Sequence, residues 1–173
     1  MADISAHGIG AGLPDGFEGH IYRRVPTGVE RSFPVAHFAT FAIPAGTGDF
    51  GGGATTLMGP NDVFASLFEY GPESVGTKLF AHQGLPRTLR PEDFSRYTLR
   101  RGLPGQAGTQ QFFTEGGRPF SLYVVLGSHA RRAPLVGRVN DLLGAIAITP
   151  KAGLGLPAGT SARPTARAVQ QWN

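Results

Sequence analysis

The side chains with which this chain could bind a metal or transfer protons include five histidines: His7, His20, His37, His82 and His129. A zinc or copper site needs three ligands that converge on the ion, and two of them are commonly two or four residues apart. The closest two histidines are thirteen residues apart, and there is no cysteine to supply a thiolate. The sequence therefore predicts no metal site, and it holds no motif for another cofactor.

Nucleophilic catalysis also lacks the residues that it needs. Ser128 and His129 are neighbours, and neighbouring side chains of an extended chain point in opposite directions. No Gly-x-Ser-x-Gly motif is present. Residues 71–78, GPESVGTK, differ from a phosphate-binding loop because Thr77 stands where that loop has its lysine. The sequence indicates no catalytic residue, and we favour a protein without enzymatic activity.

One carboxylate lies where a ligand could approach it. Asp49 belongs to segment 45–56, which contains five glycines and predicts a loop whose backbone is open to close approach. An aspartate before a glycine-rich turn is also typical of ordinary turn structure, in which its side chain binds the local backbone. An enzyme of unrecognised type, with a site near Asp49 and His82, is therefore one alternative.

Arginine is the other residue type that could recognise a ligand, since fourteen of the sixteen basic residues are arginines. If residues 84–108 fold against residues 127–133, two groups of arginines form a basic rim suited to carboxylate or phosphate groups. These arginines are Arg87, Arg90, Arg96, Arg100, Arg101, Arg131 and Arg132. Weak binding of anions or nucleic acid through this rim and the C-terminal tail is a second alternative.

The overall charge does not favour a nucleic-acid partner. The net charge is +4, but three of the excess positive charges lie on Lys151, Arg163 and Arg167, which leaves residues 1–149 nearly neutral. No motif of a nucleic-acid-binding domain accompanies them. No apolar run approaches the roughly 18 residues that a membrane span requires, and the N-terminal residues have no secretory pattern. We therefore expect a cytoplasmic protein that does not span a membrane.

The segment from Thr109 to Ile148 carries the clearest structural signals. Two runs rich in β-forming residues, TQQFFTE and RPFSLYVVL, flank Gly116 and Gly117, and this arrangement predicts a β-hairpin. A helix is predicted to begin near Pro134. Its apolar residues recur at helical spacing, so that they would lie on one side against a sheet: Leu135, Val139, Leu142, Leu143 and Ile146.

The remaining elements are read from shorter patterns. Strands are predicted at 19–25, 35–43 and 78–82, and a helix of two turns from Pro91 to about residue 100. Residues 61–71 fit either a helix capped by Asn61 or a strand with Phe64, Phe68 and Tyr70 on one face, and the density of aromatic residues favours the strand. Residues 1–16 are predicted to be a flexible N-terminus, 17–149 a single domain, and 150–173 a flexible basic tail.

Two longer runs show a family resemblance. FFTEGGRPFSLYVVLG followed by LVGRVNDLLGAIAI resembles the end of a PsbP/Mog1-like α/β sandwich, including its actinobacterial lipoprotein-type variants. The earlier runs LPDGFEGHIYRR, AHFATFAIP, GDFGGGA and DVFASLFEYG are similar to an uncharacterised family of arginine-rich actinobacterial proteins. The resemblance implies a hairpin near the C-terminus followed by a helix across the sheet. It implies no functional residue, because that fold family shares no catalytic set.

These observations together predict an α+β protein: a single-domain α/β sandwich with a curved antiparallel sheet and a C-terminal helix packed across one face. Long glycine- and proline-rich loops on a compact sheet, without a catalytic or metal-binding set, favour a non-catalytic protein-binding or scaffold module. The expected partner is another protein, and the expected contact surface consists of loops 45–56 and 84–108. Asp49 and the arginines of the basic rim are its candidate binding residues.

Overall fold

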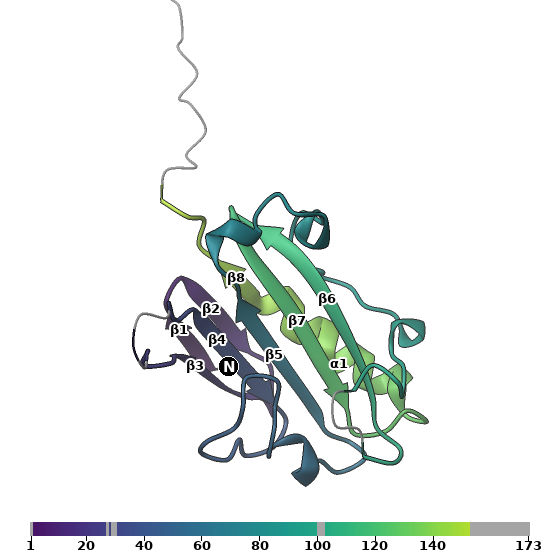
Figure 1. Cartoon of the computed structure of the whole chain (residues 1–173). Coiled ribbons are helices and arrows are strands. Elements are labelled where there is room, and N and C mark those ends of the chain that lie inside the picture. The colour runs from purple at the N-terminus through teal and green to yellow at the C-terminus, as the bar shows by residue number, and fades with distance from the viewer. Residues whose placement is uncertain (1, 27, 29–30, 100–102, 153–173) are drawn as a thin grey trace, which may run out of the picture.

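The computed structural model describes residues 2–26, 28, 31–99 and 103–152 (Figure 1). The predicted α+β sandwich is confirmed: the described residues form a single domain of two antiparallel sheets and one α-helix, α1 (Arg132–Ala145). The larger sheet has the order β3-β4-β5-β7-β6. Its strands are β3 (Glu18–Arg23), β4 (Pro34–Ala39), β5 (Val63–Glu69), β6 (Ala107–Glu115) and β7 (Arg118–Leu126).

The predicted hairpin and helix are both confirmed. Strands β6 and β7 pair from Ala107↔Leu126 to Glu115↔Arg118, and the two-residue turn between them has positive φ at Gly116 (56°) and Gly117 (75°). Two successive positive φ angles are what a tight hairpin turn needs to match the twist of its strands. Helix α1 buries the predicted apolar stripe against the sheet, although Ile146 belongs to the strand that follows.

The N-terminus is where the sequence prediction was wrong. Residues 1–16 were expected to be flexible, whereas β1 (Ala2–Ala6) and β2 (Ile9–Leu13) form a hairpin. Strand β2 alternates buried residues with glycines, and its other edge pairs with β8 (Ile146–Ile148) at the end of the chain. The alternation is regular, but glycine on every outward position hides it from a pattern of apolar and polar residues.

Three shorter predictions need correction. The strand expected at 78–82 is a single turn of 3₁₀-helix, η3 (Lys78–Phe80). The helix expected from Pro91 stops after one turn, η4 (Pro91–Asp93), because Ser95 exchanges two backbone hydrogen bonds with Gly108 at the edge of β6. The strand expected at 35–43 ends at Ala39. The strand favoured over a helix at 61–71 is confirmed as β5.

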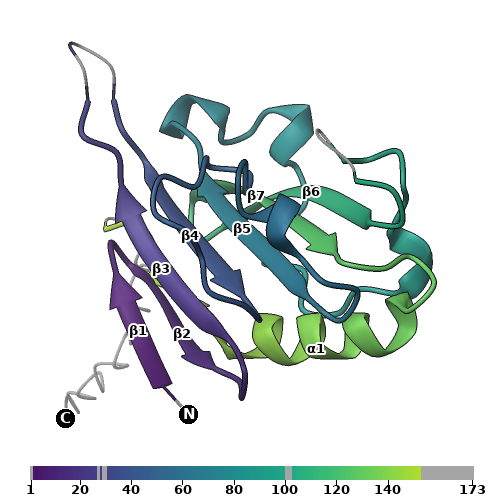
Figure 2. The ribbon, with the colours of Figure 1, turned by 90° about the horizontal axis from the view of Figure 1, so that it is seen from below.

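The larger sheet separates two apolar layers. One face packs against α1 and the smaller sheet, which lie on the same side of it (Figure 2), and buries the larger core. That core includes Phe38, Leu67, Phe113, Leu122 and Leu142, all at most 1% exposed. The other face carries the second apolar cluster, to which loop 45–56 contributes Phe50 and Ala54. The 3₁₀ turn η1 (Thr55–Leu57) follows Ala54, and η2 (Pro72–Ser74) contacts β7.

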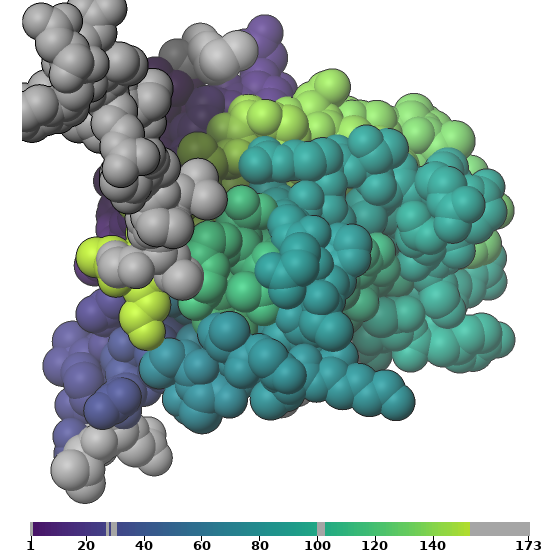
Figure 3. Space-filling view, turned by 90° about the horizontal axis from the view of Figure 1, so that it is seen from above, coloured from purple at the N-terminus to yellow at the C-terminus, as the bar shows by residue number. Residues whose placement is uncertain are grey.

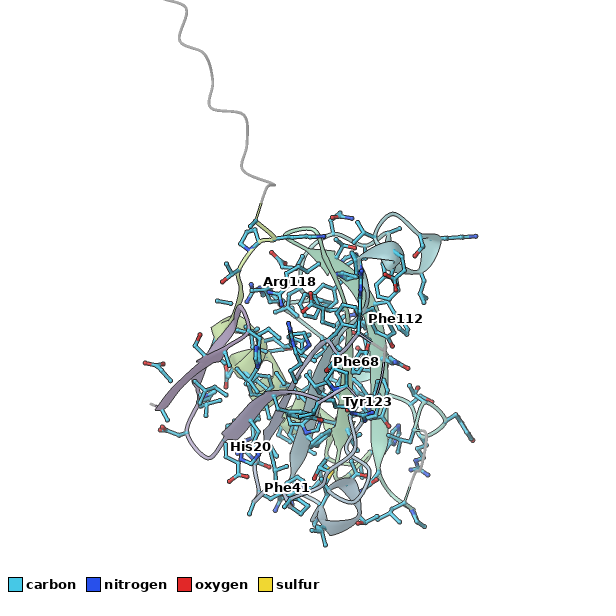
Figure 4. The ribbon with its side chains drawn as sticks, turned by 60° about the vertical axis from the view of Figure 1, so that its left-hand side comes forward. His20, Phe41, Phe68, Phe112, Arg118 and Tyr123 are labelled. Atoms are coloured by element: carbon cyan, nitrogen blue, oxygen red, sulfur yellow. The ribbon has the colours of Figure 1, made fainter. Side chains whose placement is uncertain are left out.

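Aromatic side chains occupy much of this second face. Phe50 of loop 45–56 stacks on Phe68 with ring centroids 5.7 Å apart, and Phe68 in turn contacts Tyr70 at 4.9 Å. Figure 4 shows Phe112, Phe68 and Tyr123 following one another along this face. Loop 45–56 is therefore packed on the sheet through an aromatic contact, so it has a defined position from which to present its exposed residues.

Candidate functional site

Asp49 holds loop 45–56 onto the second face of the larger sheet. Its carboxylate accepts a hydrogen bond from the Tyr22 hydroxyl (3.2 Å) and forms an ion pair with Arg24 (2.5 Å). Its backbone carbonyl accepts hydrogen bonds from Nε2 of His37 (3.0 Å) and from the hydroxyl of Ser66. Three strands are thus tied to one loop residue, which makes Asp49 a structural anchor.

The two titrating neighbours of Asp49 behave as structural groups. Burial, and then the negative charge of Asp49, raises the pKa of Tyr22 to about 12. Burial lowers the pKa of His37 below its ordinary value, so His37 is neutral near pH 7 and donates its Nε2 proton to the Asp49 carbonyl. The pKa of Tyr22 is far above the near-neutral range that general acid–base catalysis favours, and both side chains hold Asp49 in place.

The structure does not bring Asp49 and His82 together. The groups that bind Asp49 belong to β3, β4 and β5. The carbonyl of His82 instead accepts a hydrogen bond from Thr114 of β6 (2.8 Å), and β7 lies between β5 and β6. The His82 side chain is exposed. The geometry therefore gives no support to an enzyme site built from these two residues.

The predicted basic rim is only partly assembled. Arg87 donates hydrogen bonds to the carbonyls of Leu143 (2.7 Å) and Ile146 (2.6 Å), so it satisfies the C-terminal end of α1. Arg90 forms an exposed ion pair with Asp93, three residues further on. Exposed Arg131 precedes the first residue of α1, and Arg100 and Arg101 lie outside the described residues.

The remaining two arginines meet at His129. Its Nδ1 atom lies 3.5 Å from Nη2 of Arg96 and 3.4 Å from Nη1 of Arg132. The backbone N–H of His129 donates to the carbonyl of Gly105 (2.7 Å), so the C-terminal part of the 84–108 segment lies against residues 127–133, which is the condition for a basic rim. Desolvation, and then the charges of Arg132 and Arg96, lower the pKa of His129, which keeps its ring available as a hydrogen-bond acceptor.

The same segment also joins loop 45–56. Gln106 is 3% exposed, and its side-chain amide donates a hydrogen bond of 2.7 Å to the carbonyl of Thr55. Next to this junction, Leu57 is 63% exposed and Leu103 is 40% exposed, while Tyr97, beside Arg96, is 95% exposed. We call this region the loop-end surface, and it consists of Leu57, Arg96, Tyr97, Leu103, His129 and Arg132.

Most residues of the loop-end surface were not among the binding residues predicted from the sequence. Leu57 and Leu103 precede Met-Gly-Pro and Pro-Gly, where an isolated apolar residue gives no periodic signal. Their common position depends on the bond between Gln106 and Thr55, which are 51 residues apart. A local sequence pattern cannot predict a contact between residues so far apart.

A buried arginine at the opposite end of the larger sheet was also missed. Arg118 donates two hydrogen bonds to the carboxylate of Glu69, from Nε (3.0 Å) and Nη2 (2.6 Å). It also donates to the carbonyls of Gly8 (2.8 Å), His7 (3.0 Å) and Thr149 (3.1 Å). Figure 4 labels Arg118 near the end of the sheet at which Phe112 lies. The Arg118 side chain thus links the larger sheet to the β1–β2 turn and to the residue after β8 in the smaller sheet.

Comparison with known proteins adds no family assignment. No protein-family model matches this chain, and neither a curated protein nor a solved structure shows significant similarity to it. The resemblance to PsbP/Mog1-like proteins therefore stays a prediction. Within the described residues, no three potential metal ligands cluster, and no helix is long and apolar enough to cross a membrane.

Proposed function

We propose that this protein is a non-catalytic binding module whose loop-end surface binds another protein. The proposal is supported above all by the way in which three separate segments are held together. The bonds Gln106–Thr55 and His129–Gly105 fix the exposed apolar residues relative to the arginines at His129. A rigid surface loses less conformational entropy on binding than a mobile one, which favours recognition by a preformed site.

The composition of the loop-end surface suits a protein partner. Tyrosine and arginine are enriched among the residues that dominate binding energy in protein interfaces, and exposed leucines supply apolar area. Among the described residues, Arg96 and Arg132 form no ion pair with an acidic side chain. Their charge is thus free to complement a partner, and we propose that the partner presents an acidic segment that carries apolar side chains.

Photo-cross-linking tests this proposal directly. A photoreactive phenylalanine analogue replaces Tyr97 on the loop-end surface, and in a control protein it replaces Leu79, which is 57% exposed and lies in η3 near the other end of β6. We expect a discrete cross-linked protein from position 97 and none of the same mass from position 79. Mass spectrometry then identifies the cross-linked segment, which should be acidic.

Charge-reversal variants of the loop-end surface test whether the cross-linked partner binds there specifically. The double variant Arg96→Glu/Arg132→Glu should weaken binding of the identified partner at least tenfold, because it sets like charges against the acidic segment. Arg90→Glu is the matched control, since Arg90 is exposed but lies outside the loop-end surface. Equal cross-linking from positions 97 and 79, or equal affinity of the double variant and the control, would overturn the proposed function.

A further inference from the structure

A cavity lies at the end of the molecule opposite the loop-end surface. The chain reverses between β6 and β7 at this end, at the top of Figure 1, and Figure 3 looks down on it. We call this cavity the inter-sheet pocket, because it is lined by residues of the larger sheet together with the β1–β2 turn and the residues that follow β8, and its volume is about 420 Å³. A volume of this size is within the range of small-molecule sites in proteins.

The floor of the inter-sheet pocket is rigid. Arg118 lines it and holds three other lining segments through its bonds to Glu69, to the His7–Gly8 turn and to Thr149. Within the described part of the chain, His7 is the one non-glycine residue with a positive φ angle, 53°. The Arg118 network keeps this uncommon backbone in place, and such conformations persist where surrounding contacts determine them.

The walls of the pocket carry unneutralised positive charge. Arg23, Arg31 and Lys151 all line it, and none of them forms an ion pair with another described residue. Glu69 is the one acidic residue among the lining residues, and both of its oxygens are engaged by Arg118. The lining residues therefore leave a net charge of about +3 facing the cavity, which attracts anions.

The rest of the wall is apolar and in part planar. Two aromatic rings and three prolines contribute to it: Phe33, Tyr70, Pro72, Pro119 and Pro150. An inorganic ion would leave most of this apolar surface in contact with water. A ligand with an apolar body as well as an anionic group would cover it, since burial of apolar surface provides much of the binding free energy in such pockets.

We propose that the inter-sheet pocket binds a small organic anion, either a carboxylate or a phosphate monoester, that carries a planar apolar body. The anionic group lies among Arg23, Arg31 and Lys151, and the planar body lies against Phe33 and Tyr70. This site is independent of the loop-end surface. The nine residues of β7 separate the two, which corresponds to about 26 Å along the strand.

Calorimetric titration with three probes of the same shape tests the site. The probes are 1-naphthoate, 1-naphthyl phosphate and the neutral 1-naphthylmethanol. We expect one or both anions to bind at least tenfold more tightly than the alcohol. The stronger of the two anions identifies the head group, and added inorganic phosphate should compete with it. Affinity should fall with rising salt, since exposed charges are screened.

The double variant Arg23→Gln/Arg31→Gln should weaken binding of the anions about tenfold, which corresponds to a factor of a few for each exposed charge. Binding of the alcohol should be unchanged. Arg90→Gln is the control, because the side chain of Arg90 is also exposed but pairs with Asp93 and does not line the pocket. Thermal unfolding verifies that each variant is folded. Failure of both anions to bind at millimolar concentration, or equal affinity in wild type and double variant, would overturn the proposal.

Discussion

Replacement of Arg118 by alanine tests how the two sheets are held together. The wild-type side chain makes five hydrogen bonds, of which two go to Glu69 and three to backbone carbonyls. The side chains of the ion pair are only 10% and 13% exposed. The substitution therefore leaves the carboxylate of Glu69 without its partner in a place that water reaches poorly.

The decrease in the free energy of unfolding can be estimated from the burial of the ion pair. Removal of one partner from a buried ion pair costs about 3–5 kcal/mol. We therefore expect Arg118→Ala to lower the free energy of unfolding by about 4 kcal/mol.

Urea unfolding followed by circular dichroism at pH 7 measures this change in the free energy of unfolding. Arg90→Ala is the control, because the exposed pair of Arg90 and Asp93 should contribute less than about 0.5 kcal/mol. Hydrogen exchange provides a second measurement: the amides of the β1–β2 hairpin should lose protection first, since Arg118 binds its turn. A loss below about 1 kcal/mol would refute the reasoning.

Three further predictions concern the turn, a buried histidine and the core. Gly116→Ala should lower the free energy of unfolding by more than about 1 kcal/mol, because φ is 56° and the new Cβ would lie 2.7 Å from Cα of Pro150. Gly137→Ala, on the open side of α1, should not destabilise the protein. Equal unfolding midpoints of the two variants would contradict this. Because the pKa of His37 is lowered in the folded protein, its contribution to stability is complete above about pH 6.5 and declines at lower pH. His37→Gln should make the free energy of unfolding in urea less dependent on pH below about 6.5. An unchanged pH dependence would exclude His37 as the cause of the decline. Leu142→Ala should cost about 2–5 kcal/mol in the same assay, against almost nothing for exposed Leu57→Ala, and similar losses would mean that α1 is not part of the core.

The parts of the fold that could be predicted are those encoded by neighbouring residues. Gly116 and Gly117 specify a turn by themselves, and the apolar stripe of α1 is visible within fourteen residues. The N-terminal hairpin was missed because glycines occupy the outward positions of β2, and because the other edge of β2 pairs with β8, more than 130 residues later. The same holds for the candidate sites: Arg118 binds a carbonyl 111 residues away, and sequence spacing carries no signal for such a contact.

The position of β8 near the C-terminal end of the domain has a consequence for folding during synthesis. Strands β1 and β2 leave the ribosome before the larger sheet, yet their sheet is completed by β8, the last strand in the described part of the chain. Arg118, which fastens their turn, also appears only after two thirds of the chain has been made. Nascent chains halted before residue 118 should therefore expose the N-terminal hairpin to proteases or chaperones. The smaller sheet is completed only when β8 pairs with β2.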